Sequence, residues 1–179
     1  MKTRKQLRLR WLALVLVVLS WTGVACAAVP ETQPAQVVRV VSGQTLEVLL
    51  PDGPAEPQTV RLLGLDAPDL RQEPWGEAAQ AYLAEQLEGQ TVGLELDVEP
   101  ADSYGRQLAY VWQDGQLVNE RIIAQGWGLA IARSPNLRYD DRLQQAQMVA
   151  RALGRGIWNP DQPLRQTPTE FRQSLPDAS

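Results

Sequence analysis

The chain has 179 residues, which suffices for one domain with processing segments and is short for two. It contains no histidine and one cysteine, Cys26, which excludes an internal disulfide, a Ser-His-Asp or Cys-His nucleophile and histidine-containing zinc sites. Any bound metal must therefore be a hard cation on oxygen ligands, such as calcium or magnesium.

The first residues have the three-part pattern of an export signal. Five basic residues lie between positions 2 and 10, an apolar run covers residues 11–21, and small residues dominate 23–28. The apolar run is too short to span a bilayer as a mature helix. We therefore expect residues 1–27 to direct export, and the protein to be secreted, periplasmic or lipid-anchored at the cell envelope.

The cleavage pattern leaves three alternatives open. Residues 25–27 (Ala-Cys-Ala) fit the small-x-small rule of ordinary signal peptidase. Residues 23–26 (Gly-Val-Ala-Cys) also resemble a lipoprotein box with glycine where leucine is usual, in which case Cys26 carries lipid and anchors the protein to a membrane. An uncleaved membrane anchor is the third alternative.

Removal of the signal makes the chain strongly acidic. Five of the 17 basic residues lie within residues 1–27, so 12 basic residues, all of them arginine, face 21 acidic ones and give a formal charge of −9. Nucleic-acid binders usually carry a basic footprint, because phosphate contacts dominate their affinity. A polyanion could therefore bind only at a local positive cleft.

The apolar patterns along the chain predict an α+β fold, mainly a five-stranded OB-type barrel with about three helices. Residues 28–35 are expected to form a linker, 36–160 the domain and 161–179 a flexible tail. The expected strands are 36–41, 45–50, 58–65, 91–98 and 108–112, and the expected helices are 77–87, 117–125 and 140–153.

Two polar segments carry the chemistry. Residues 61–69 (Arg-Leu-Leu-Gly-Leu-Asp-Ala-Pro-Asp) predict a buried strand that ends at an acidic corner, and residues 102–106 (Asp-Ser-Tyr-Gly-Arg) form a turn before another strand. Each segment supplies one arginine, and guanidinium groups match phosphate oxygens. Two arginines and two acids are the parts of a site that binds a metal and a phosphate together.

These segments, with residues 118–120 (Val-Asn-Glu), 125–126 (Gln-Gly) and 156–158 (Gly-Ile-Trp), resemble the staphylococcal nuclease (thermonuclease) family. The resemblance covers roughly residues 36–160. It implies the OB-type barrel and calcium-assisted hydrolysis of DNA or RNA phosphodiester bonds. Nothing in the sequence identifies a protein partner.

The resemblance also implies roles for individual residues. Arg61 and Arg106 stand at the catalytic arginine positions, where they clamp the scissile phosphate and stabilise the charge of the transition state. Asp69 stands where the family has a glutamate that activates the attacking water. Tyr104 matches a substrate-binding tyrosine beside the second arginine. The residues at the metal positions are Asp66, Ala67 through its carbonyl, and Gln44.

The chain departs from the family pattern at several of these positions. Gln44 replaces a charged metal ligand, and calcium affinity depends on the number of charged ligands, so we expect a weak site. Asp69 is shorter than glutamate by roughly 1.5 Å, and a misplacement of that order costs about 10²-fold in rate. Ile131 and Arg133 replace tyrosines of the family, and the loop after the corner keeps one basic residue, Arg71.

Three functions remain open on these residues. The first is an exported nuclease with weak calcium-assisted activity, and the second is a catalytically inactive OB-fold binding or structural module of the cell envelope. A phosphate binder without hydrolysis lies between them. The charge around Arg61 and Arg106 discriminates: a positive cleft, joined by Arg133 or Arg71, favours a polyanion substrate, whereas arginines neutralised by Asp66, Asp69 and Asp102 favour a structural role.

Overall fold

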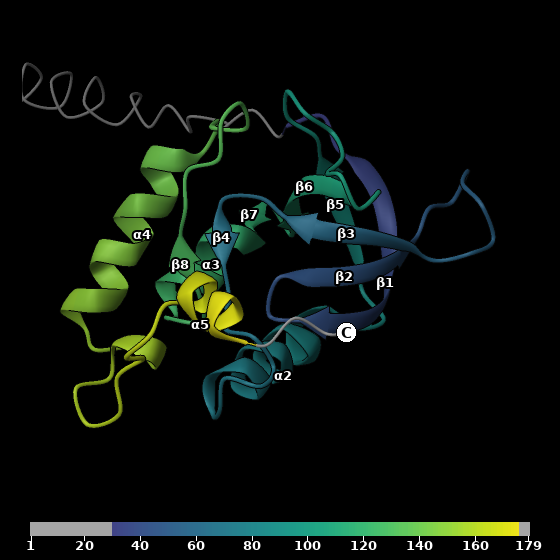
Figure 1. Cartoon of the computed structure of the whole chain (residues 1–179). Helices are drawn as coiled ribbons and strands as arrows, with labels where there is room; N and C mark the ends of the chain where they lie inside the picture. The colour runs from purple at the N-terminus through teal and green to yellow at the C-terminus, as the bar shows by residue number, and fades with distance from the viewer. Residues whose placement is uncertain (1–29, 176–179) are drawn as a thin grey trace, which may run out of the picture.

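A computed structural model describes residues 30–175, and its centre is a closed five-stranded barrel (Figure 1). The strands are β1 (Gln33–Ser42), β2 (Thr45–Leu49), β3 (Gln58–Leu62), β5 (Thr91–Glu95) and β6 (Gln107–Gln113). They pair in the order β3-β2-β1-β5-β6, and a parallel pairing of β3 with β6 closes the barrel. The predicted α+β fold with an OB-type barrel is thereby confirmed.

The barrel forms because its strands bury small and branched apolar side chains on one face. Leu46 and Val48 of β2, Val60 and Leu62 of β3 and Leu94 of β5 are all at most 1% exposed. Register shifts in the β1–β2 ladder mark irregularities of β1, and such bulges bend a strand and increase its twist. A long, bent β1 can therefore pair with β2 at one end and β5 at the other.

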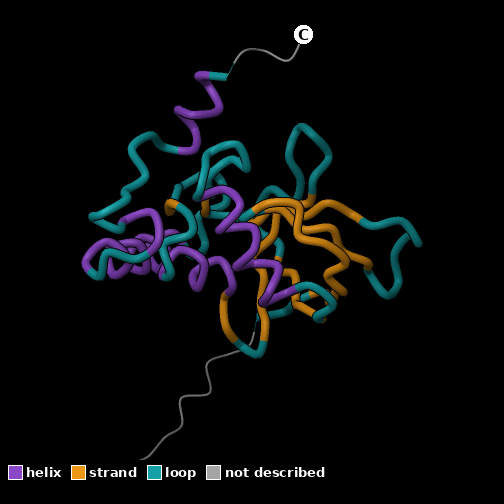
Figure 2. The backbone as a smooth tube through the Cα atoms, turned by 90° about the horizontal axis from the view of Figure 1, so that it is seen from below, coloured by secondary structure: helices purple, strands orange, loops and turns teal. Residues whose placement is uncertain are grey.

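Helices lie mainly on one side of the strands (Figure 2). The described residues form four α-helices, where the sequence predicts about three: α2 (Trp75–Leu87), α3 (Val118–Ala124), α4 (Asp140–Ala152) and α5 (Pro168–Ser174), with a short 3-10 helix, η1 (Gly156–Trp158). Helix α2 lies across one end of the barrel and buries Ala79, Leu83 and Leu87, which are spaced four residues apart on one face.

Gly64 divides the strand that the sequence predicts over residues 58–65. Its φ of +71° suits glycine, and a Cβ there would lie 2.3 Å from Cδ1 of Leu143. After this turn the chain continues as β4 (Leu65–Asp66), which pairs with β8 (Leu129–Ala130) outside the barrel. The turn thus moves the acidic corner from the barrel wall to a position between the barrel and the helices.

The two ends of the described chain differ from the expected boundaries. Strand β1 begins at Gln33, inside the expected linker. Helix α5 lies inside the expected flexible tail, where Thr167 and Glu170 form a capping box and a proline occupies the first turn. The expected export signal and Cys26 lie outside the described residues. Within residues 30–175, no helix has the length and apolar character needed to cross a membrane.

Candidate phosphate-binding site

Barrel closure brings the two predicted arginines together. The parallel β3–β6 register sets Val60 opposite Gln107 and Arg61 opposite Leu108, so Arg61 and Arg106 lie at neighbouring points of the barrel wall. Both side chains line a cavity of about 490 Å³. The other residues that line this cavity are Gln44, Tyr104, Arg133 and Arg172. Four arginines therefore surround one space.

Asp102 holds Arg106 in place. One carboxylate oxygen of Asp102 accepts hydrogen bonds from the backbone N–H groups of Tyr104 and Arg106, each at 3.0 Å. The other accepts from Nε of Arg106 at 2.7 Å and pairs with Nη2 at 2.7 Å. The ring of Tyr104 lies 5.4 Å from the Arg106 guanidinium carbon and is 83% exposed, so it can stack on the cation and still meet a ligand.

Arg61 is the most buried of the four cavity arginines. Its side chain is 12% exposed, and this burial lowers the pKa of Arg61 to about 10. The value of about 10 also includes the charge of Asp66, which lies 3.7 Å away and raises the pKa, and the charges of Arg106, Arg133 and Arg172, which lower it. An anion bound in the cavity would reduce the repulsion among these four positively charged side chains. The cavity can therefore attract an anion even though the chain as a whole is acidic.

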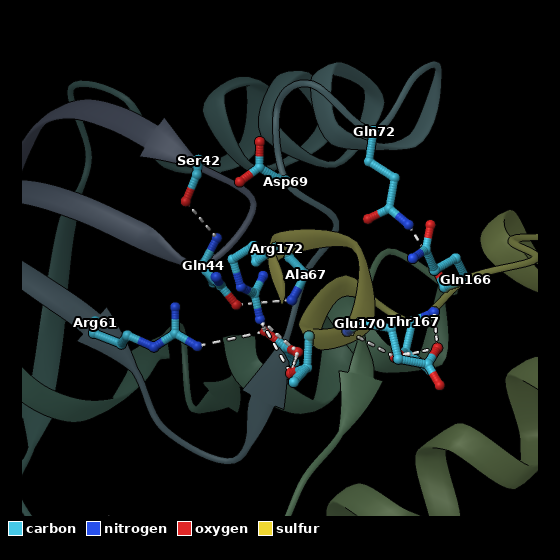
Figure 3. Close-up of polar contacts among 12 residues, drawn as sticks. Ser42, Gln44, Arg61, Ala67, Asp69, Gln72, Gln166, Thr167, Glu170 and Arg172 are labelled. Atoms are coloured by element: carbon cyan, nitrogen blue, oxygen red, sulfur yellow. Dashed lines mark hydrogen bonds and ion pairs between the residues drawn. The ribbon is translucent and has the colours of Figure 1, made fainter. Parts of the chain in front are cut away.

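Asp66 binds the C-terminal helix. Nη2 of Arg172 donates to both carboxylate oxygens of Asp66, at 2.6 and 2.8 Å, and the hydroxyl of Thr169 donates to one of them at 2.8 Å (Figure 3). Arg172 lies beyond the segments that resemble the family, so no role is predicted for it from the sequence. The Thr-Pro-Thr-Glu pattern at residues 167–170 could have predicted the start of α5, but not its docking place.

Gln44 and Ala67, which the resemblance places among the metal ligands, are joined by a hydrogen bond. Oε1 of Gln44, which is buried, accepts from the backbone N–H of Ala67 at 2.7 Å. The amide oxygen expected to coordinate a metal is therefore directed at a donor. Both oxygens of Asp66 are likewise bound to donors.

This donor set does not fit a calcium ion in the arrangement described. A hard cation needs several oxygen ligands with free lone pairs, and charged ones bind it most strongly. Within residues 30–175, no group of three or more acidic, histidine or cysteine residues could hold a metal ion. The position beside Asp66 instead holds the guanidinium group of Arg172.

Asp69 is not among the residues that line the cavity, and its principal partner is Arg71. Its Oδ1 accepts from the backbone N–H of Arg71 at 3.0 Å and from Nε of Arg71 at 2.9 Å. These hydrogen bonds lower the pKa of Asp69. Of the two arginines considered from sequence as additions to the cleft, Arg133 lines the cavity, whereas Arg71 is paired with Asp69.

Two buried asparagines join separate segments of the chain. Asn119 is fully buried and accepts from Val111 N–H and donates to Leu63 C=O, both at 2.8 Å, which ties β6 to the segment after β3. Asn136 exchanges side-chain hydrogen bonds with the backbone of Glu99 at 2.8 and 2.9 Å. Asn119 belongs to the segments that carry the family resemblance, but the sequence predicts no structural role for it.

Comparison with known proteins places this chain in a family. The family described as "Staphylococcal nuclease homologue" matches residues 59–160. The chain is 35% identical to the thermonuclease of Staphylococcus hyicus over 132 residues, which cover 71% of this chain and 76% of the relative. It is 35% identical to the thermonuclease of Staphylococcus intermedius over 127 residues (68% and 74%). It is also 30% identical to endonuclease YncB of Bacillus subtilis (strain 168) over 128 residues (68% and 59%). The chain therefore belongs to the staphylococcal nuclease family.

Proposed function

We propose that this domain binds the phosphodiester backbone of DNA or RNA and hydrolyses it slowly. The observation that carries the proposal is the convergence of Arg61, Arg106 and Arg133 on one cavity with the exposed ring of Tyr104. A guanidinium group can donate two parallel hydrogen bonds to the oxygens of one phosphate, and an aromatic ring can stack on any base. Because none of these groups reads a base edge, the activity has little sequence preference.

In the proposed reaction, a water molecule attacks phosphorus and loses a proton to Asp69. A new P–O bond forms to the water oxygen, and the P–O bond to the leaving sugar oxygen breaks as that oxygen gains a proton from solvent. Arg61 and Arg106 stabilise the charge that develops on the phosphate oxygens. A carboxylate with a lowered pKa is a weak base, so the hydrogen bonds of Arg71 to Asp69 favour slow turnover.

The calcium dependence of this chain is part of the proposal. Thermonucleases of this family are generally calcium-dependent. In this chain, the amide of Gln44 and the pairing of Asp66 with Arg172 oppose metal binding. We infer that calcium adds little to the activity unless a carboxylate stands at position 44.

Cleavage of a labelled oligonucleotide by the purified chain tests the proposal. We expect slow cleavage at similar rates with calcium and with a chelator, and faster, calcium-dependent cleavage by Gln44→Asp, because the change adds a charged ligand. Gln116→Asp, at an exposed position of β7 (Gln116–Leu117), is the matched control for charge. Absence of cleavage by the unmodified chain under both conditions would reject hydrolysis.

The pH dependence tests the role of Asp69. Arg71 lowers the pKa of Asp69, so the carboxylate stays ionised at pH values below its ordinary pKa. The pH at which the cleavage rate falls on the acid side of the pH–rate profile should therefore be low. In Arg71→Ala the pKa of Asp69 rises toward its ordinary value, so the rate should fall at a higher pH. Arg39→Ala, which changes an exposed arginine of β1, should leave this pH unchanged. An unchanged pH in Arg71→Ala would exclude Asp69 as the base.

A second function follows from the pairing of Asp66. The ion pair with Arg172 and the commitment of Gln44 to the backbone favour a binding module of the cell envelope that holds nucleic acid without cleaving it. The signal-like pattern of residues 1–27 supports export in either case. Binding of an oligonucleotide that is recovered intact after long incubation would identify this function.

A further inference from the structure

The carboxylate of Asp66 requires a positive partner. Asp66 is 1% exposed, and a buried carboxylate without a counter-charge is strongly destabilising. Arg61 reaches it only at 3.7 Å, whereas Arg172 binds both of its oxygens at 2.6 and 2.8 Å. The hydroxyl of Thr169 adds a further donor to the same carboxylate. Helix α5 thus supplies the principal cation at this position.

Arg172 has donors left after it binds Asp66. Within the described residues, its hydrogen bonds all involve Nη2, whereas a guanidinium group carries five N–H donors on three nitrogens. The side chain is 33% exposed and lines the same cavity as Arg61, Arg106 and Arg133. Arg172 can therefore hold the carboxylate with one nitrogen and offer Nε and Nη1 to an anion in the cavity.

Local contacts fix the helix that carries Arg172. The side chain of Glu170 accepts from Thr167 N–H at 2.8 Å, and the hydroxyl of Thr167 accepts from Glu170 N–H at 3.2 Å. Gln72, which is buried, donates to the carbonyl of Gln166 at 2.7 Å and joins this segment to the loop after the acidic corner (Figure 3). Arg172 is therefore positioned before any ligand arrives, which reduces the entropic cost of binding.

We propose that Arg172 is the resident cation of this site and that it binds nucleic-acid phosphate together with Arg61 and Arg106, without a divalent metal ion. This inference rests on the proposed function, because it states how the same cavity holds its phosphate. The cation stands between a buried carboxylate and a substrate phosphate, and it is carried by a segment outside the matched residues 59–160. Phosphate binding is then independent of metal and dependent on α5.

The test is the affinity of the purified full chain for a fluorescein-labelled tetrathymidylate, measured by initial fluorescence anisotropy in chelator and in calcium. We expect the two dissociation constants to agree within about twofold. Arg172→Gln should weaken binding in chelator by about tenfold or more, because a charge-assisted hydrogen bond to phosphate is lost. Arg165→Gln makes the same change of charge on an exposed position before α5 and should leave the affinity within about twofold.

Thr169→Ala distinguishes the effect of the Arg172 charge on binding from the effect of α5 being held against Asp66. It removes a hydrogen bond to Asp66 but keeps Arg172, so we expect an affinity within about threefold of the unmodified chain. A tenfold loss in Thr169→Ala, equal to that of Arg172→Gln, would overturn the proposal in favour of a purely structural role for α5. Thermal unfolding followed by circular dichroism establishes that each variant is folded.

The comparison of calcium with chelator requires no variant and distinguishes the two proposals. Binding by the unmodified chain only in calcium would overturn the resident-cation proposal and leave nucleic-acid binding intact. Full affinity of Arg172→Gln in chelator would do the same. Failure of the unmodified chain to bind in either condition would overturn both. Equal binding in the two conditions, with loss in Arg172→Gln, supports both.

Discussion

Replacement of Arg106 by alanine is expected to slow phosphodiester cleavage by about 10²- to 10³-fold, the cost of removing one preorganised donor from a transition-state site. Asp102 holds the Arg106 guanidinium group by contacts at 2.7 Å, so the donor needs no reorganisation during the reaction. Arg61 remains in the variant and retains part of the stabilisation. Single-turnover cleavage of a labelled oligonucleotide by excess protein measures the change in the chemical step.

The matched control for this prediction is Arg39→Ala. Arg39 lies on β1, pairs with Glu47 at 2.6 Å and has a side chain that is 61% exposed, so the variant makes the same change of net charge away from the cavity. We expect its cleavage rate to stay within about twofold of the unmodified chain, because exposed ion pairs contribute little. Equal losses in the two variants would show that overall charge, and not the position of Arg106, governs cleavage.

Replacement of Asn119 by leucine is expected to lower the free energy of unfolding by about 3 kcal/mol, because it leaves two buried backbone groups without partners. Asn119 is fully buried, and its amide bonds Val111 N–H and Leu63 C=O. Leucine has a similar size, so a cavity contributes little to the loss. Urea denaturation followed by circular dichroism gives the free energy, provided the slope with denaturant is unchanged.

Asn159→Leu provides the comparison for Asn119→Leu. The side chain of Asn159 accepts one hydrogen bond from Asp161 N–H at 2.9 Å in an exposed setting, where water can replace the lost partner. We expect a loss of less than about 1 kcal/mol. A loss in Asn119→Leu no greater than this would show that the bridge between β6 and the segment after β3 contributes little to the stability of the barrel.

Local sequence patterns predicted the barrel well. Strands, turns and amphipathic helices depend on residues near one another in the chain, and hydrophobic periodicity reports which face of each element is buried. The patterns around residues 45–50 and 91–98 thus located β2 and β5, and the pattern over residues 77–87 located α2. The family resemblance that rests on residues 61–69 and 102–106 is confirmed by the relatives.

The sequence also located the candidate arginines, although their catalytic roles stay predictions. It could not show that Arg133 lines the cavity while Arg71 binds Asp69, because both stand in loops and the choice of partner depends on the path of each loop. The break at Gly64 was missed for a related reason. A glycine within an apolar run is compatible with a continuous strand, and the clash of a Cβ with Leu143 involves a helix far along the chain.

The barrel, the family and the pair of arginines that barrel closure brings together can therefore be predicted from the amino-acid sequence. The partner of Asp66 cannot, because it depends on contacts between distant parts of the chain. The partner, Arg172, follows it by 106 residues and lies in a segment whose composition predicts a flexible tail. A buried carboxylate requires a cation, but its own neighbours in sequence do not specify which one, since that depends on where a distant helix docks.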